Sequence, residues 1–508
     1  MTVFAFGRSI KIRAIVLPRI SRAILPALFV LGALPLYVLT PAPLADWASH
    51  LARVSVTNQF LHGASFWVAR YNYQGLLLPN AILDAVVLGL VRVGLNIDSA
   101  GYCFLALCYF SFVGGFSRLS RVYGLPSIVS VSLGILLFYT GNVVYGLVNF
   151  VTGVGLTMFA ASYWLEDNAN FRRRCLIALV ATPAIMFCHI LAALLFVAIC
   201  GGFTLLRPGQ HEGSLDLRSL RRRSVSMIPT MIALTISVVG YKLSASGADK
   251  LIIGYDGAPG ASSIVRGKLR QAAEGLSSGN QLADLILSVV VAGILWCIWQ
   301  RRSCLRWAEV VPLAGLAVLP FLAPFRVGEG MLLDTRLFVI PILIGVAALP
   351  WANRLGAKWQ YAIVAACIFR SLVLASSWAS YASIYDELQT AFSRLPPGST
   401  LLSAYSDEPG FYKDKQPPLR NSATLAVKYG VFVPSMFAEP TQQPLAILPQ
   451  WRPTWLWEHS ANARSPSALA SVRDRAKRFC GIDPLSHLFI LHVTKMPPFT
   501  IESECSTP

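Results

Sequence analysis

Long apolar runs recur between residues 20 and 378 of this 508-residue chain, and they restrict its fold more than any other feature. Each run is close to the ~20 mostly apolar residues that a helix needs to cross a bilayer. Only 13% of the residues are charged, against about 25% in a soluble domain. The runs do not alternate as the strands of a membrane barrel do. The sequence therefore predicts an all-α polytopic membrane protein.

The basic residues set the predicted orientation of the spans. The formal net charge of +18 fits the tendency of Lys and Arg to collect in cytoplasmic loops, and no nucleic-acid motif accompanies it. The basic segments 1–22, 207–224 and 301–306 are placed inside. This predicts about eleven transmembrane helices. Residues 80–97, which carry Asp84 and Arg92, form an additional interfacial helix that does not cross.

Four regions follow from this pattern. They are an N-terminal cytoplasmic segment with the first transmembrane helix, a first outer loop with juxtamembrane helices, a multi-span domain, and a small outer α/β domain, at residues 1–40, 41–79, 80–379 and 380–508. The last region is more polar, with predicted strands at 399–406 and 487–495 and a helix at 465–479.

The first outer loop contains the strongest chemical motif, Asp46-Trp-Ala-Ser-His50-Leu-Ala-Arg53. In a helix these three charged or titratable residues stand at i, i+4 and i+7 and share one face. One interpretation is a catalytic site, with Asp46 as the base, His50 as its helper or a metal ligand, and Arg53 as an anion binder. The other is a capped interfacial helix with a local ion pair.

The motif and its setting resemble the GT-C superfamily of integral-membrane glycosyltransferases. Two further segments add to the resemblance, Tyr145-Gly-Leu-Val-Asn149-Phe150 and Phe432-Val-Pro434-Ser-Met-Phe437 with Gln442-Gln443-Pro444. The resemblance implies a polyprenyl-phosphate sugar donor, a glycan or lipid acceptor, and a site on the periplasmic face of a bacterial inner membrane. It also implies that Asp46 activates the acceptor hydroxyl.

The sequence departs from these relatives near the motif. Ala48 stands where they often have proline, and no second acidic residue adjoins Asp46. Some GT-C enzymes use such a pair to bind a metal, so the dependence on Mg²⁺ or Mn²⁺ is left open and no metal ligand is assigned.

Further candidate substrate-binding residues lie elsewhere in the chain. Arg336 begins an apolar run at a predicted membrane boundary, and Asp334 and Glu329 precede it in the loop 326–336. An arginine here suits a lipid phosphate, although arginines at helix ends also act as anchors. His189 lies between two short apolar helices, where an ionisable residue is a functional candidate. Asn149 opens a predicted span, where it could bind a sugar hydroxyl or cap a helix.

Two other functions remain open from the residues alone. A transporter or flippase of a lipid-linked substrate would place polar groups inside the spans, where Arg370 is the main charge of the last ones. A non-catalytic assembly partner would keep the architecture without the chemistry. The deciding question is whether Asp46, His50 and Arg336 lie at one place.

Overall fold

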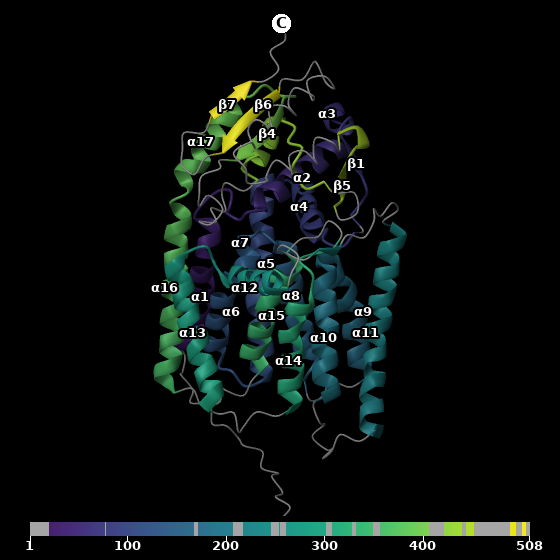
Figure 1. The fold of residues 1–508 in the computed structure, drawn as a ribbon, viewed down its shortest axis with the longest axis vertical. Helices are drawn as coiled ribbons and strands as arrows, with labels where there is room; N and C mark the ends of the chain where they lie inside the picture. Colours follow the sequence, from purple (N-terminus) through teal and green to yellow (C-terminus); the bar gives the residue numbers. More distant parts are fainter. Residues whose placement is uncertain are drawn as a thin grey trace, which may run out of the picture.

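The computed structural model describes residues 20–76, 78–166, 171–206, 217–244, 253–254, 261–300, 307–327, 332–348, 356–405, 421–438, 443–451, 488–493 and 500–503. Within these ranges the chain is mostly helical, as predicted. Long helices stand side by side in one half of the molecule, and short helices and small sheets gather at one end of them (Figure 1). We call these parts the bundle and the cap.

The bundle helices coincide with the apolar runs of the sequence, although the helix Leu217–Ser244 begins within the basic segment 207–224. They are α1 (Ile20–Ala33), α5 (Ile97–Val122), α6 (Ser127–Phe138), α8 (Val148–Trp164), α9 (Phe171–Cys188), α10 (Ile190–Leu206), α11 (Leu217–Ser244), α13 (Gln281–Gln300), α14 (Trp307–Leu322), α15 (Leu333–Ala348) and α16 (Ala357–Ala379). Among the described residues, three helical stretches are long and apolar enough to cross a membrane by length and composition, Ile97–Val122, Gln281–Gln300 and Ala357–Ser393.

This number is smaller than the eleven spans predicted. Several predicted spans are present as helices of 16 or 17 residues, such as α8 and α14, about 25 Å long at 1.5 Å per residue. Such helices fall just short of the ~30 Å hydrocarbon thickness.

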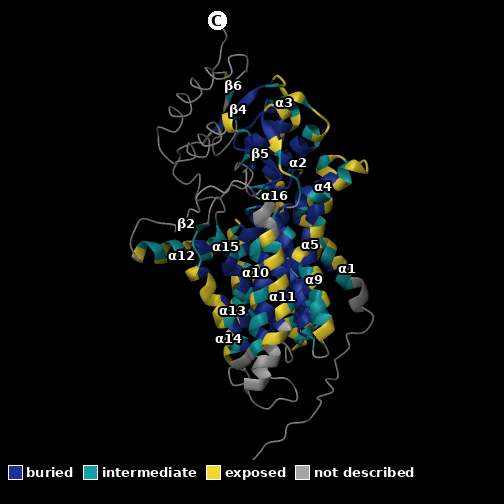
Figure 2. Cartoon of the chain, turned by 90° about the vertical axis from the view of Figure 1, so that its right-hand side faces the viewer, coloured by how far each residue is buried: buried dark blue, intermediate teal, exposed yellow. Residues whose placement is uncertain are grey.

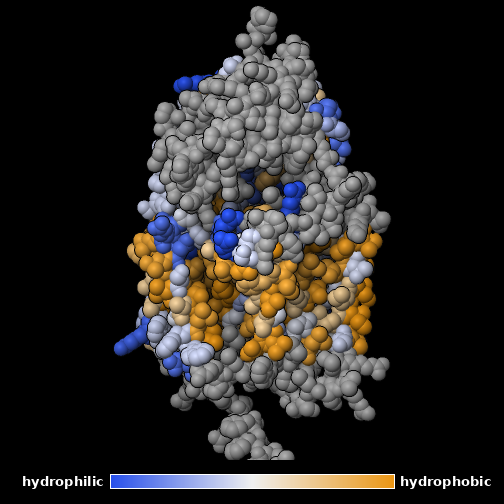
Figure 3. Space-filling model, viewed as in Figure 1, coloured by the Kyte–Doolittle hydropathy of each residue, from blue (hydrophilic) through white to orange (hydrophobic). Residues whose placement is uncertain are grey.

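The outer surface of the bundle is apolar. Figure 3 shows a band of hydrophobic residues across the face in view, below the cap. On α13, Leu285, Val289 and Trp296 are each about 60% exposed, and Figure 2 shows further exposed residues along α11 and α13. Contiguous exposed apolar surface of this kind is typical of a membrane-facing or interaction surface.

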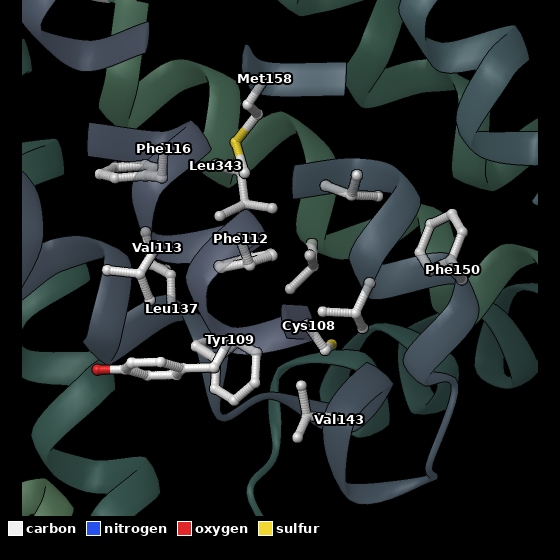
Figure 4. Close-up of a cluster of buried hydrophobic side chains, with 14 of the residues drawn as sticks. Cys108, Tyr109, Phe112, Val113, Phe116, Leu137, Val143, Phe150, Met158 and Leu343 are labelled. Atoms are coloured by element: carbon white, nitrogen blue, oxygen red, sulfur yellow. The ribbon is translucent and has the colours of Figure 1, made fainter. Parts of the chain in front are cut away.

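Close packing of α5 against α8 forms the centre of the bundle. A Cβ added at Gly155 would lie 2.4 Å from the backbone of Ser111, so the two helices meet backbone to backbone. Phe112, Phe116 and Met158 surround this contact in the buried cluster drawn in Figure 4. This core therefore holds α5 and α8 together in the bundle.

In the cap, the first outer loop and the C-terminal region share one hydrophobic core. Strand β1 (Tyr71–Tyr73) pairs with β5 (Leu445–Ile447), and Trp451 donates a hydrogen bond to the Ala69 carbonyl at 3.1 Å. The buried cluster joins α2 (Trp47–Leu61) with α3 (Ser65–Val68), α17 (Ala382–Ser393) and the 3-10 helix η5 (Ser422–Tyr429). Two regions separate in sequence thus form one structural unit.

The two strands predicted in the C-terminal region are present. β4 (Thr400–Tyr405) pairs in parallel with β6 (Leu488–Val493), and β7 (Thr500–Ser503) joins β6 antiparallel. The helix predicted at 465–479 lies outside the described residues. The α/β character of this region therefore stays a prediction.

Two short helices lie between bundle and cap. α4 (Ile82–Arg92) has 11 residues, about 16 Å, which is too short to cross a bilayer and agrees with the non-spanning helix predicted there. α12 (Ala261–Leu276) was not among the helices predicted from the sequence. Its small residues and four charges concealed a helix that the bundle supports.

Candidate functional site

Asp46 stands at the entrance to α2, on the underside of the cap. The chain before it lies along the turn after α7 (Gly141–Val144), where the Ala45 amide donates to the Val144 carbonyl at 2.9 Å and the Asp46 amide to Tyr145 at 3.2 Å. Gly146, with φ of +77°, approaches so closely that an added Cβ would lie 2.8 Å from the Asp46 nitrogen. The Tyr145-Gly146 segment noted in the sequence therefore holds the acid in place.

The Asp46 carboxylate does not cap its own helix. Asp46 makes no side-chain bond to the first turn of α2. Instead its Oδ1 accepts a hydrogen bond from Asn421 Nδ2 at 3.1 Å, and the same amide reaches the Ala45 carbonyl at 3.3 Å. Asn421 has a left-handed backbone, with φ of +58°. The C-terminal region thus orients the predicted base. The carboxylate does not act as a helix cap.

Arg336 lies at the cap-side end of α15 and contacts His189, at the junction of α9 and α10. The two side chains are 2.6 Å apart, from Nη1 to Nε2. A guanidinium only donates, so His189 Nε2 accepts. The His189 ring packs edge-on against Phe150, with centroids 5.3 Å apart. The Arg336 backbone is held too, since its carbonyl accepts from Asn142 Nδ2 at 3.3 Å.

Arg336 also interacts electrostatically with Asp46 and His50 of the first-loop motif. Its guanidinium attracts the Asp46 carboxylate and repels positive charge on His50. Asp46 and Arg336 are only partly buried. Geometry agrees with this attraction, since Tyr145 accepts from the Asp46 amide at 3.2 Å and Asn142, three residues earlier, donates to the Arg336 carbonyl at 3.3 Å. The residues whose proximity was the deciding question are therefore gathered around α7 and the turn after it.

His50 is buried within this cluster. Its ring meets Phe437 of the C-terminal region edge-on at 5.4 Å, and its Nδ1 is buried without a hydrogen-bond partner. Burial lowers the pKa of His50 well below its ordinary value near 6.5. The Arg53 and Arg336 charges lower this pKa further, while the Gly146 backbone opposes them. His50 is therefore neutral at pH 7.

A depressed histidine pKa makes folding stability depend on pH. The unfolded chain takes up the proton below about pH 6.5 and the folded chain does not. Stability from His50 is therefore complete above this pH and falls below it, by up to about 1.4 kcal/mol per pH unit. We expect the melting temperature to drop between about pH 6.5 and about pH 5, and His50→Gln to drop less. His62→Gln is the matched control, because His62 is exposed at the end of the same helix. An equal drop in His50→Gln and wild type would contradict this assignment.

Arg53, predicted as an anion binder, is engaged elsewhere. Its Nε and Nη2 donate to the two carboxylate oxygens of Asp84 at 2.8 and 2.7 Å, and both side chains are fully buried. Such a two-pronged pair uses the face that would bind a phosphate. Arg53 thus links α2 to α4, and the structure does not support its predicted role as a direct phosphate ligand.

Two other predicted substrate-binding residues also have structural partners. Asp334 forms a buried ion pair with Lys268 of α12 at 2.8 Å. Asn149 donates to Asn80 at 2.6 Å and accepts from the Leu83 amide at 3.2 Å, which caps α4. Both therefore fasten helices beside the site rather than present free groups to a ligand. Glu329 lies outside the described residues.

No metal site emerges from the described parts of the chain, where no group of three His, Cys, Asp or Glu side chains could hold an ion. The prediction that left Mg²⁺ or Mn²⁺ open is not tested by this. Asn421 and Lys268 were missed as neighbours of the site. Each stands in a polar stretch with no motif, so sequence spacing offered no signal for either.

Comparisons with protein-family models, with curated proteins and with solved structures each gave no match. The geometry of the site therefore carries the functional argument.

Proposed function

We propose that this protein is a membrane glycosyltransferase that moves a sugar from a polyprenyl-phosphate donor to a glycan or lipid acceptor of the cell envelope. One observation carries the proposal. Asp46 from the first loop and the Arg336–His189 pair from the bundle are both held by α7 and the turn after it, where the bundle meets the cap (Figure 1). A lipid phosphate would lie at this level, with its chain in the band and its sugar toward the cap.

The chemistry needs one base and one anion site. Asp46 takes the proton of an acceptor hydroxyl, and that oxygen attacks the anomeric carbon of the sugar. The bond from this carbon to the phosphate oxygen breaks with inversion. Polyprenyl phosphate leaves with the bonding electrons, and Arg336 neutralises its charge. His50 and His189 line the site without adding charge, and a base positioned in such a site is effective.

The same proposal orients the chain in a bacterial inner membrane. The N-terminus is cytoplasmic, the cap periplasmic, and eleven helices cross while α4 and α12 do not. The shorter bundle helices cross with a mismatch that a bilayer accommodates at modest cost by thinning. The exposed apolar side chains on α11 and α13 support placement of the bundle in a membrane.

The contacts of Arg370 weigh against a transporter. This buried side chain of α16 donates to the carbonyls of Leu136 and Tyr139 at 2.6 Å and of Ala283 at 2.9 Å. It therefore joins the ends of α6 and α13 to α16. The charge that most suggested a transport path satisfies backbone groups instead.

The test uses purified protein in vesicles and a panel of radiolabelled polyprenyl-phosphate sugars as donors. Transfer of the label to acceptors from native membranes is measured. We expect Arg336→Gln to weaken binding of the donor by about 10- to 100-fold, since hydrogen bonds to charged groups contribute about 1.5–3 kcal/mol. Arg92→Gln is the control, because Arg92 is an exposed arginine at the end of α4. Transfer by wild type together with unchanged donor affinity in Arg336→Gln would refute this phosphate site. No transfer from any donor of the panel would refute the enzyme.

A further inference from the structure

Helix α12 lies in an unusual position for this bundle. It runs across the direction of α13 and α14, at their cap-side end (Figure 2). In Figure 3 hydrophilic residues border a hollow at this level, just above the apolar band. A helix in this orientation cannot cross a membrane, but it can lie in the interface between lipid and water.

The side chains of α12 separate into three stripes. Lys268, Gln271 and Gly275 face the protein and are buried. Val265 and Leu269, one helical turn apart, are 57% and 59% exposed. Arg266 and Arg270 stand beside them on the next face, both exposed. An exposed apolar stripe flanked by cations is the pattern of a helix whose apolar face enters the headgroup boundary and whose cations meet anionic lipid.

The protein-facing stripe of α12 contacts residues next to Arg336 and a residue that holds Asp46. Lys268 pairs with Asp334, two residues before Arg336, and Gln271 forms a hydrogen bond with Thr335. Glu274 accepts from the Tyr145 hydroxyl at 3.1 Å. Tyr145 in turn accepts from the Asp46 amide through its carbonyl. Any shift of α12 relative to the bundle would therefore reach both Asp46 and Arg336.

We infer that α12 is a docking surface for anionic phospholipid in the leaflet beside the cap. Val265 and Leu269 enter the acyl boundary, and Arg266 and Arg270 bind the phosphate headgroups. Arg270 does so while it approaches Glu274 of its own helix at 4.0 Å. We infer an anionic lipid because the positive charges of Arg266 and Arg270 stand beside the exposed apolar stripe. A further consequence is that the bilayer, through α12, keeps Asp46 and Arg336 correctly placed relative to each other. This consequence rests on the proposed function.

Photo-crosslinking tests the location of α12. A benzoylphenylalanine at position 269 of the full-length protein, in vesicles of phosphatidylethanolamine and phosphatidylglycerol, is expected to form lipid adducts detectable by mass spectrometry. The same probe at position 61 is the control, since Leu61 is an exposed apolar residue at the cap end of α2. We expect at least about tenfold more lipid adduct at 269, as expected for an interfacial helix. Equal adduct at both positions, or adduct to a copurified polypeptide instead, would overturn the inference.

Retention of anionic lipid tests the two arginines. Arg266→Gln/Arg270→Gln is expected to retain several-fold less phosphatidylglycerol on purification than wild type. Arg92→Gln/Arg394→Gln removes the same charge from two exposed arginines of other helices, and should retain as much as wild type. An equal loss in both double variants would overturn specific binding by α12. These readouts need no sugar transfer, so they can succeed even if the proposed function fails. If transfer occurs, its rate should rise several-fold with phosphatidylglycerol in wild type and not in Arg266→Gln/Arg270→Gln.

Discussion

Asp46→Asn is expected to lower sugar transfer by about 10²- to 10⁴-fold, the usual contribution of a positioned general base. Asparagine has almost the same shape and can still meet the Asn421 amide that bonds Asp46 Oδ1 at 3.1 Å. It cannot take a proton from a hydroxyl. The main-chain contacts that place this residue, from its amide to Tyr145, do not involve the side chain. The loss should therefore appear in the turnover rate, with donor affinity and melting temperature nearly unchanged.

The control for this prediction is Asp98→Asn. Asp98 is an exposed acid in the first turn of α5, so its variant changes the net charge equally and should keep wild-type turnover. Transfer rates are measured with saturating donor and acceptor, beside donor binding for each variant. Full turnover by Asp46→Asn would exclude Asp46 as the base. A loss of donor binding without a loss of turnover would instead assign Asp46 to substrate positioning.

The sequence predicted the chemical types of the site better than their partners. The Asp46–His50 spacing and the Tyr145–Asn149 segment both mark the site, because each belongs to a short local stretch that keeps its geometry. Arg336 was predicted from its place before an apolar run. Its contact with His189 joins residues far apart in the chain, and only the packing of α15 against the α9–α10 junction creates it.

Arg53 shows why the roles of charged residues were harder to predict. It shares a helical face with Asp46 and His50, which favoured a common function. Its side chain, however, turns to Asp84 of α4, a residue that was noted only as a reason why the helix should not cross. A buried charge takes the nearest opposite charge that folding supplies, and a linear sequence does not show which one is nearest.

For the fold, sequence composition predicted those elements whose residues share one chemical character. Apolar runs marked the bundle helices, and β-branched and aromatic residues marked β4 and β6. Helix α12 was missed because its lipid-facing stripe has only a few apolar residues among Ser, Gly and Arg. The union of the first loop with the C-terminal region depends on β1 pairing with β5. Such pairing between distant segments has no local signal.

The second large effect concerns stability, and Asp84→Ala is expected to destabilise the protein by about 3–5 kcal/mol, the usual result of removing one partner of a buried ion pair. Arg53 would remain fully buried with its charge unpaired, since both side chains have no exposed surface. Total folding stability is often only about 5–15 kcal/mol. We therefore expect a strongly lowered melting temperature in detergent, or failure of the variant to accumulate in membranes.

The double variant Arg53→Met/Asp84→Leu keeps this prediction testable if the single variant cannot be purified. It removes both charges and keeps apolar volume between α2 and α4, so most of the lost stability should return. A matched control is Glu166→Gln, which breaks the ion pairs of Glu166 with Arg118 and Arg173, where all three side chains are 22–33% exposed. Its cost should stay below about 1 kcal/mol, because water screens such pairs. If the double variant were as unstable as Asp84→Ala, the cost would lie in packing rather than in the unpaired arginine.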